Sequence, residues 1–151
     1  PFLLGNLPTS SDFAFYGQIS QLVRFDPTPR EICHQIAPRV VAWVEIMDDL
    51  SGLDLETLMW TDLENCTDTL KAIIAEFGKM YANLLIENSK EVEEGLPEWA
   101  VDIDGLSWKQ KTFSYQAKCL NWLRDEFNGL SEVDQQRVMS FLAGSGCEQI
   151  L

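Results

Sequence analysis

The chain has 151 residues, of which 46% are hydrophobic, and its formal net charge at pH 7 is −13. This length and composition predict one globular domain and exclude a disordered chain, which would be poor in aromatic residues. The negative charge argues against binding to nucleic acid or to an anionic membrane surface, because both interactions need clustered lysine and arginine side chains.

The first predicted helix covers residues 10–24. Thr9 is a favourable N-cap, and Asp12 lies three residues later, where its carboxylate can reach back to the N–H of the cap. Apolar residues then recur at steps of three and four, which predicts one buried face. They are Phe13, Tyr16, Ile19, Leu22 and Val23, with Phe15 beside them.

Two helices are predicted next, over 29–37 and 38–49, or one helix kinked at Pro38. Thr28 is the expected cap of the first helix and Pro29 its first residue. Pro38 separates the two because proline lacks the backbone donor and its ring collides with the preceding turn. The second helix has few polar residues and is expected in the interior of a bundle.

After a turn region, the longest predicted helix runs over residues 62–91. Its apolar residues alternate at steps of three and four, the pattern of a core helix in a bundle and also of a coiled coil. The bundle is the more common source of such a pattern. The stripe comprises Leu63, Cys66, Leu70, Ile73, Phe77, Met80 and Leu84, with Ile74, Tyr81 and Leu85 alongside.

A small β-hairpin is predicted near 99–113, because apolar and other residues alternate there around an Asp104-Gly105 turn. Helices over 114–127 and from Ser131 to about 143 complete the chain, with Gly129 ending the first. The expected buried residues of 114–127 are Tyr115, Cys119, Leu120, Trp122, Leu123 and Phe127. The predicted fold is therefore an all-α multi-helix bundle with one hairpin, in a single domain over 1–151.

Few residues suggest chemistry. His34 is the one histidine of the sequence, and its neighbour Cys33 points about 100° away on the same helix, so the two make a poor catalytic pair. The sequence has no phosphate-binding glycine loop and no zinc or serine-hydrolase motif. We predict no catalytic residue and no metal ligand.

Cys33, Cys66, Cys119 and Cys147 are scattered, without a C-x-x-C pair. They are expected to be reduced thiols, which predicts a cytoplasmic protein. No apolar run approaches the ~20 residues needed to span a membrane. Cys119 lies beside Lys118 and near Arg124, but it also belongs to an apolar stripe, which favours a packing role over a reactive thiol.

Two carboxylate-rich runs, 45–56 and 87–104, lack the alternate spacing of a calcium loop and are interpreted as solvated faces. Four aromatic residues in and after the hairpin leave two interpretations open, the lining of a ligand pocket or packing of the hairpin onto the bundle. They are Trp99, Trp108, Phe113 and Tyr115.

The stretch "FLLGNLPTSSDFAFYGQI" resembles the part of glutathione transferases where a short glycine-containing loop leads into the capping-box helix at the centre of the C-terminal helical domain. Thr9 and Asp12 match the cap and third helical position of that motif. "APRVVAWVEIMDDLSG" resembles the following segment, and "FSYQAKCLNWLRDEF" and "GSGCEQIL" are similar to the tail of a bacterial branch of the family. The match is vaguest over 55–110.

In that family a thioredoxin-like domain and about two helices precede the capping-box loop. The thioredoxin-like domain carries most of the glutathione site and the group that activates the thiol, so the resemblance carries no catalytic residue over to this sequence. It implies that Thr9 and Asp12 are structural, and that glutathione is a co-substrate only where the thioredoxin-like domain exists.

The resemblance leads to the hypothesis that the chain is the C-terminal helical part of a glutathione-transferase-like protein, which forms one wall of the acceptor-substrate pocket. Its expected partners are its own thioredoxin-like domain or a second copy, and a small hydrophobic ligand. The alternative is a self-standing helical binding or oligomerisation module without catalysis. A thiol redox enzyme using Cys119 or Cys33 is a third, weaker hypothesis.

Overall fold

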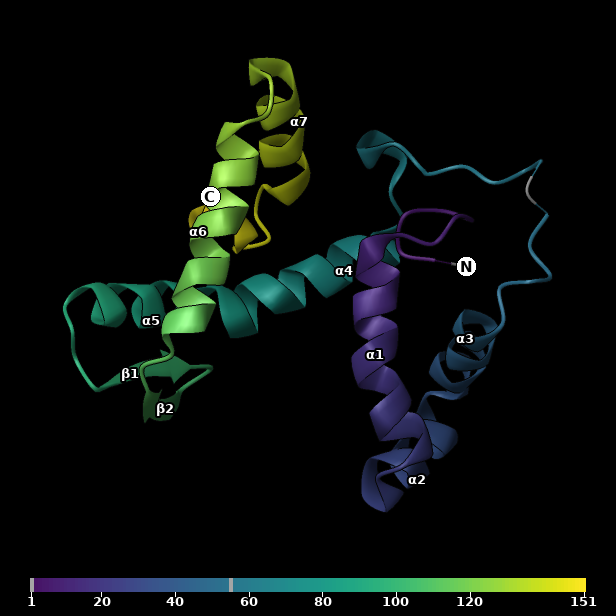
Figure 1. Ribbon diagram of the computed structural model, residues 1–151, viewed down its shortest axis with the longest axis horizontal. Helices are drawn as coiled ribbons and strands as arrows, with labels where there is room; N and C mark the ends of the chain where they lie inside the picture. Colours follow the sequence, from purple (N-terminus) through teal and green to yellow (C-terminus); the bar gives the residue numbers. More distant parts are fainter. Residues whose placement is uncertain (1, 55) are drawn as a thin grey trace. The chain divides into compact units, whose positions relative to one another are not determined.

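The computed structural model describes residues 2–54 and 56–151 and is mostly helical, with one two-stranded antiparallel hairpin. This confirms the helical class and the hairpin predicted from the sequence. The helices are α1 (Ser10–Arg24), α2 (Pro27–Ile36), α3 (Pro38–Asp48), α4 (Asp68–Phe77), α5 (Asn83–Glu93), α6 (Ser114–Asn128) and α7 (Glu132–Leu142), and the strands are β1 (Glu98–Ile103) and β2 (Leu106–Lys111) (Figure 1). Residues 1 and 55 lie outside the described residues, the latter within the predicted turn region.

Contacts along the chain divide it into two compact units, Pro1–Cys66 and Thr67–Leu151. We call them the first and the second unit and describe each by itself. The single domain expected over 1–151 stays a prediction. None of the helices in the described residues combines the length and hydropathy of a transmembrane span.

In the first unit, α1 contacts both α2 and α3 (Figure 1). Arg24, at the end of α1, donates hydrogen bonds to Glu45 and Asp48 of α3 at 3.0–3.1 Å, and the hydroxyl of Tyr16 donates to Asp48. These bonds pair the last turns of α1 and α3. The prediction that α1 covers 10–24 is confirmed.

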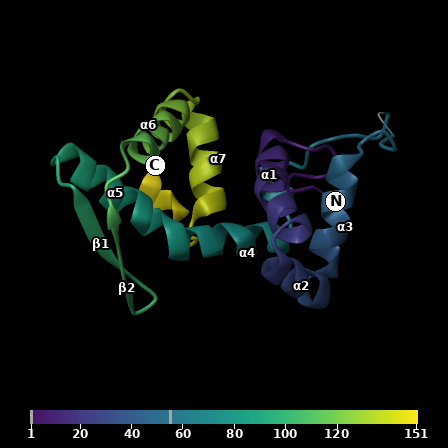
Figure 2. The same cartoon turned by 60° about the horizontal axis from the view of Figure 1, so that its bottom comes forward.

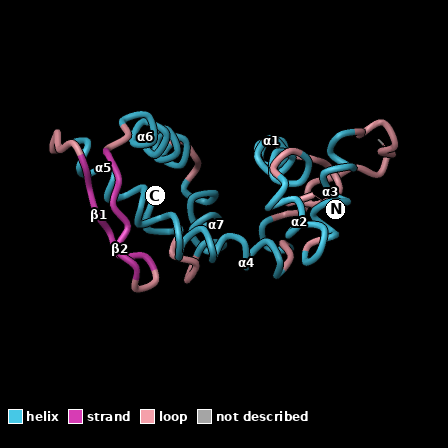
Figure 3. Tube along the Cα trace, turned by 90° about the horizontal axis from the view of Figure 1, so that it is seen from below, coloured by secondary structure: helices cyan, strands magenta, loops and turns pink. Residues whose placement is uncertain are grey.

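The loop before α1 is tied to a distant part of the first unit. Thr61 N donates to Leu4 O at 2.8 Å, and Met59 N donates to the side-chain oxygen of Asn6 at 2.7 Å. Figure 3 shows both segments as loops. Gly5 has φ of +122° and packs against the backbone of Met59, where a Cβ would come within 2.8 Å of the carbonyl oxygen. A residue with a side chain would therefore be strained at position 5.

The start of α2 differs from the prediction. Asp26, not Thr28, is the N-cap, because its Oδ1 accepts a hydrogen bond from Thr28 N at 3.1 Å and Pro27 occupies the first helical position. Both Pro27 and Pro29 suit the first turn of a helix, so the sequence pattern alone chose the wrong one. The break before Pro38 is confirmed, and Ala37 joins two separate helices.

The second unit is built on one continuous helical rod formed by α4, a π-helical segment at Gly78–Ala82, and α5 (Figure 2). The predicted long helix is thus present, but it begins at Asp68, because the hydroxyl oxygen of Thr67 accepts from Leu70 N and caps it there. Residues 63–65 form a separate 3₁₀ turn. No pattern in the sequence indicates the π segment.

The hairpin pairs β1 with β2 in the register Ile103↔Leu106, so Asp104 and Gly105 form a two-residue turn. Both turn residues have positive φ, +54° and +79°, as the Asp-Gly dipeptide predicts. On the inner face, Trp99 is buried and its Nε1 donates to the side-chain oxygen of Asn88 in α5 at 3.1 Å. The hairpin is therefore fastened to α5, with which β1 is in contact.

α6 packs against α5, and Gly129 and Ser131 mark the junction to α7 as predicted. The side-chain amide of Gln135 in α7 donates to the carbonyl of Phe127, at the end of α6, at 3.2 Å. After α7, a 3₁₀ turn at Cys147–Ile150 lies against the π segment. This C-terminal turn becomes part of the candidate site.

The predicted burial is wrong at several positions. Leu70, Val23 and Leu120 are buried as expected. Other large apolar residues of the same stripes have an exposed fraction of about two fifths or more. Each unit has too few elements to cover a whole stripe, so only some members of each stripe are enclosed. The exposed members are Phe13, Leu22, Phe77, Met80, Tyr81, Tyr115, Trp122 and Leu123.

Candidate functional site

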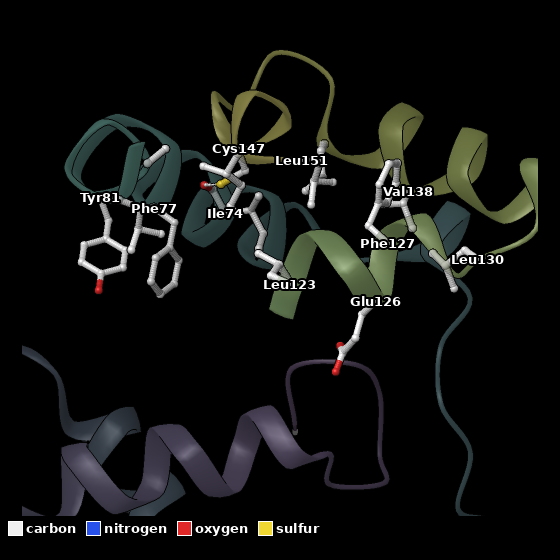
Figure 4. Close-up of a pocket in the computed structure, with 14 residues that line it drawn as sticks. Ile74, Phe77, Tyr81, Leu123, Glu126, Phe127, Leu130, Val138, Cys147 and Leu151 are labelled. Carbon is white, nitrogen blue, oxygen red and sulfur yellow. Dashed lines mark hydrogen bonds between the residues drawn. The ribbon is translucent and has the colours of Figure 1, made fainter. Parts of the chain in front are cut away.

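The second unit contains an apolar pocket of about 530 Å³. One wall comes from the helical rod, a second from α6, and the rest from α7 and the C-terminal turn (Figure 4). The lining residues are Ile74, Phe77, Tyr81, Ala82, Leu85, Leu123, Glu126, Phe127, Leu130, Val138, Leu142, Cys147, Ile150 and Leu151. A volume of this size lies within the range of small-molecule sites.

The π segment forms part of the pocket wall. Phe77 ends α4, and Tyr81 and Ala82 belong to the π turn, so the irregular part of the rod faces the cavity. Single π turns inside α-helices occur frequently at functional sites. The Tyr81 hydroxyl accepts a hydrogen bond from the Gln116 side chain of α6 at 2.6 Å, which links the rod to α6 beside the pocket.

The C-terminal turn reaches the rod through two glycines. A Cβ on Gly78 would lie 1.9 Å from the carbonyl oxygen of Ser145, and one on Gly146 would lie 3.2–3.4 Å from Gly78 backbone atoms. Gly146 also has φ of +85°. The two backbones therefore meet at a distance that only glycine at position 78 allows, and this contact brings the turn over the pocket.

Hydrogen bonds hold the turn in the same place. Arg124 Nε of α6 donates to Ile150 O at 2.8 Å, and the Cys147 thiol donates to Ile74 O at 3.3 Å, shown dashed in Figure 4. Glu148 accepts from Gly144 N and from the Ser145 hydroxyl. Backbone donors of the turn, its own N–H first, hold the pKa of Glu148 below its usual value.

The interior of the pocket offers packing and little chemistry. Burial raises the pKa of the Cys147 thiol, so this group stays protonated at neutral pH and is a weak nucleophile. Glu126 is the single charged residue among the described residues that line the cavity. The described residues that line the pocket include no nucleophile paired with a base. Their apolar side chains suit the pocket to binding an apolar molecule.

Thr9 and Asp12, predicted as a capping box, belong to the first unit, whereas all pocket residues belong to the second. Thr9 Oγ1 accepts from Asp12 N, and Asp12 Oδ2 accepts from Thr9 N at 2.8 Å, so both bonds of the box are present. Asp12 is fully buried, and its Oδ1 also accepts from Leu3 N at 2.9 Å. The residue thus joins the helix start to the preceding loop.

The structure does not bring the other candidate residues together. His34 is exposed near the end of α2, and none of the four cysteines forms a disulfide, with Cys66 and Cys147 buried. Within residues 2–54 and 56–151, no three acidic, histidine or cysteine side chains gather as metal ligands. Cys119 and Cys33 are half-buried and belong to different units.

The four aromatic residues singled out from the sequence do not line the pocket. Trp99 of β1 is buried, whereas Phe113 and Tyr115 are exposed, with ring centroids 6.2 Å apart and ring planes tilted by 47°. Trp108 is exposed as well. Packing of the hairpin against α5 explains Trp99, and none of the four belongs to the lining of this pocket.

Sequence reasoning found the pocket residues of the rod and α6 as apolar stripes, but missed those of α7 and the C-terminal turn. It also missed Asn88, a fully buried residue that accepts from Phe113 N at 2.8 Å and donates to Phe113 O at 3.0 Å. A polar residue inside an apolar helical pattern was the available signal. Its partners could not be identified without the fold.

Comparison with known proteins found no match to this chain among family models, curated proteins or solved structures.

Proposed function

We propose that this chain is the helical, acceptor-binding part of a glutathione-transferase-like protein, and that the pocket of the second unit binds a small hydrophobic molecule. The observation that carries the proposal is the apolar pocket of about 530 Å³ between the helical rod, α6, α7 and the C-terminal turn. Burial of apolar ligand surface against such walls is the main source of affinity in small-molecule sites.

The first unit supports the family part of the proposal. In the resemblance, the capping box fixes a glycine-containing loop onto the central helix, and here Asp12 is buried and bonded to both the loop residue Leu3 and the cap residue Thr9. This arrangement makes the loop and the start of α1 one structural element.

In this proposal the group that activates glutathione belongs to a thioredoxin-like domain that packs against the chain. The chain alone should neither bind glutathione tightly nor transfer its thiol, because the pocket lining is apolar apart from the carboxylate of Glu126 and Cys147 is held as a protonated thiol. Saturable thiol transfer by the purified 151 residues would contradict this assignment.

Ligand binding can be tested by filling the cavity. Val138 and Val133 both lie on α7, but only Val138 lines the pocket, and Val133 is 66% exposed. We expect Val138→Trp to abolish fluorescence-detected binding of the neutral probe N-phenyl-1-naphthylamine, and Val133→Trp to leave it unchanged. Equal binding by both variants, with unchanged circular dichroism, would reject the pocket as the site.

A second candidate function is a self-standing helical binding or oligomerisation module. The observation that favours it is the set of large apolar side chains exposed in the first unit, among them Phe25 and Ile36 at 72% and 77%. Exposed apolar patches commonly mark interaction surfaces. A stable dimer in light scattering, together with no binding of the probe, would favour this module over the transferase.

A further inference from the structure

The pocket has an apolar interior and a single acidic group. Thirteen of its fourteen lining residues have uncharged side chains, and the fourteenth is Glu126 of α6. Figure 4 shows its carboxylate directed away from the apolar side chains of Phe127 and Val138. Glu126 is exposed, so its carboxylate lies at the solvent edge of the pocket, where it can contact the polar end of a ligand whose apolar part fills the cavity.

Three cationic side chains of the second unit have partners other than Glu126. Arg124 donates through Nε to Ile150 O, Lys118 lies 4.8 Å from the ring centre of Trp122, and Lys79 pairs with Asp104 at 3.2 Å. In the parts of the chain that the structure describes, the side chain of Glu126 makes no hydrogen bond or ion pair. Its charge is therefore uncompensated by a local side chain.

We propose that the pocket selects amphiphiles with an apolar tail and a cationic head, such as an alkylammonium group, and disfavours anionic ones such as a fatty acid. The inference rests on the proposed function, since it names the ligand class of that same pocket. A cation at the mouth gains attraction from Glu126, and a carboxylate is repelled by it. The lining residues include no lysine, arginine or histidine that could pair with an anionic head.

Three ligands with the same ten-carbon tail test the charge preference. Decylamine, decanol and decanoate compete, below their micelle concentrations at pH 7, with bound N-phenyl-1-naphthylamine. We expect decylamine to bind about three- to fivefold more tightly than decanol, the scale of a partly exposed ion pair, and decanoate to bind more weakly than decanol.

Two carboxamide variants separate a local effect from the overall charge of −13. Glu126→Gln should abolish the preference, so that decylamine and decanol bind equally. Asp125→Asn, at the next position of α6 and outside the lining residues, removes the same charge and should keep the preference. Retention of the preference in Glu126→Gln, or its loss in Asp125→Asn, would overturn the inference.

The outcomes also separate this inference from the proposed function. If the probe does not bind the unmodified protein, the proposed function fails and the inference fails with it. If the probe binds and Val138→Trp abolishes binding, but decanoate competes as well as decylamine, the inference alone is overturned.

Discussion

At the scale of single residues, Asp12 is a buried carboxylate whose polar surroundings come from three donors. Leu3 N, Thr9 N and the Thr9 hydroxyl all donate to it at 2.8–2.9 Å. A buried charge without such partners would be strongly unfavourable, so the loop before α1 and the carboxylate stabilise each other.

Replacement of Asp12 by alanine should therefore lower the free energy of unfolding by more than the loss of an ordinary N-cap does. Loss of an N-cap costs about 0.5–2 kcal/mol, and the orphaned buried donors add to it, so we expect a loss of about 2–4 kcal/mol. The midpoint of urea unfolding measures this loss. Ser11→Ala, at an exposed position in the same turn, is the control and should change the midpoint little. An equal midpoint for Asp12→Ala and wild type would contradict the capping argument.

A second residue-scale prediction concerns acid stability. The hydrogen bonds from Arg24, and then from Tyr16, hold the pKa of Asp48 below its ordinary value of 3.8. A carboxyl whose pKa is lower in the folded state stabilises the fold above its unfolded pKa, and this contribution is lost as pH falls through the folded pKa. We expect Asp48→Asn to make the fall in unfolding midpoint below about pH 4 shallower.

Urea titrations from pH 2.5 to 6 measure the effect of Asp48→Asn. Asp62→Asn serves as the matched control. Asp62 is exposed and occupies the N-cap position of the 3₁₀ turn, but its side chain makes no capping hydrogen bond. If both variants keep the wild-type slope, the bond between α1 and α3 does not contribute to the acid dependence.

At the scale of elements, the helical rod and the C-terminal turn depend on Gly78. Its φ and ψ of −60° and −44° are ordinary helical values, so alanine would gain about 1 kcal/mol in helix propensity if space allowed. The Cβ would however lie 1.9 Å from a backbone oxygen of Ser145, which cannot move without displacing the turn. The steric cost should exceed the gain.

Gly78→Ala should displace the turn, lower thermal stability and expose Cys147. Mass spectrometry after brief treatment with a disulfide reagent should show faster labelling of Cys147, and probe binding should weaken because Ile150 and Leu151 line the pocket. Gly17→Ala in α1 is the matched substitution. A Cβ added at position 17 would have no other element's atom within 4 Å, so this variant should be more stable than wild type. Unchanged Cys147 labelling in Gly78→Ala would show that the turn accommodates the methyl group.

At the scale of the whole molecule, the negative charge is shared by both units while the apolar pocket is confined to the second. The first unit has only three basic residues, Arg24, Arg30 and Arg39, and Arg24 is bonded to Glu45 and Asp48. A partner that covers the exposed apolar residues of this unit would also contact a surface rich in carboxylates. Basic residues at the edge of the partner's interface would therefore favour association.

Local sequence signals determined most of the element boundaries. The limits of α1 and α6, the break before Pro38 and the two-residue turn at Asp104 and Gly105 follow from caps, prolines and a turn dipeptide that act within a few residues. The start of α2 was misplaced because Asp26 and Thr28 are both good caps followed by proline.

Only the tertiary structure decided which apolar residues are enclosed, where the rod becomes π-helical, and that a pocket exists. Periodicity shows that a helix has an apolar face, but the elements that cover this face come from elsewhere in the chain. Phe77 and Leu123 lie in predicted stripes, yet they line a cavity because Gly78 lets the distant turn at Ser145 approach the rod. Close contacts between segments far apart in sequence leave no periodic signal, so the sequence determined the helices and the tertiary structure determined the site.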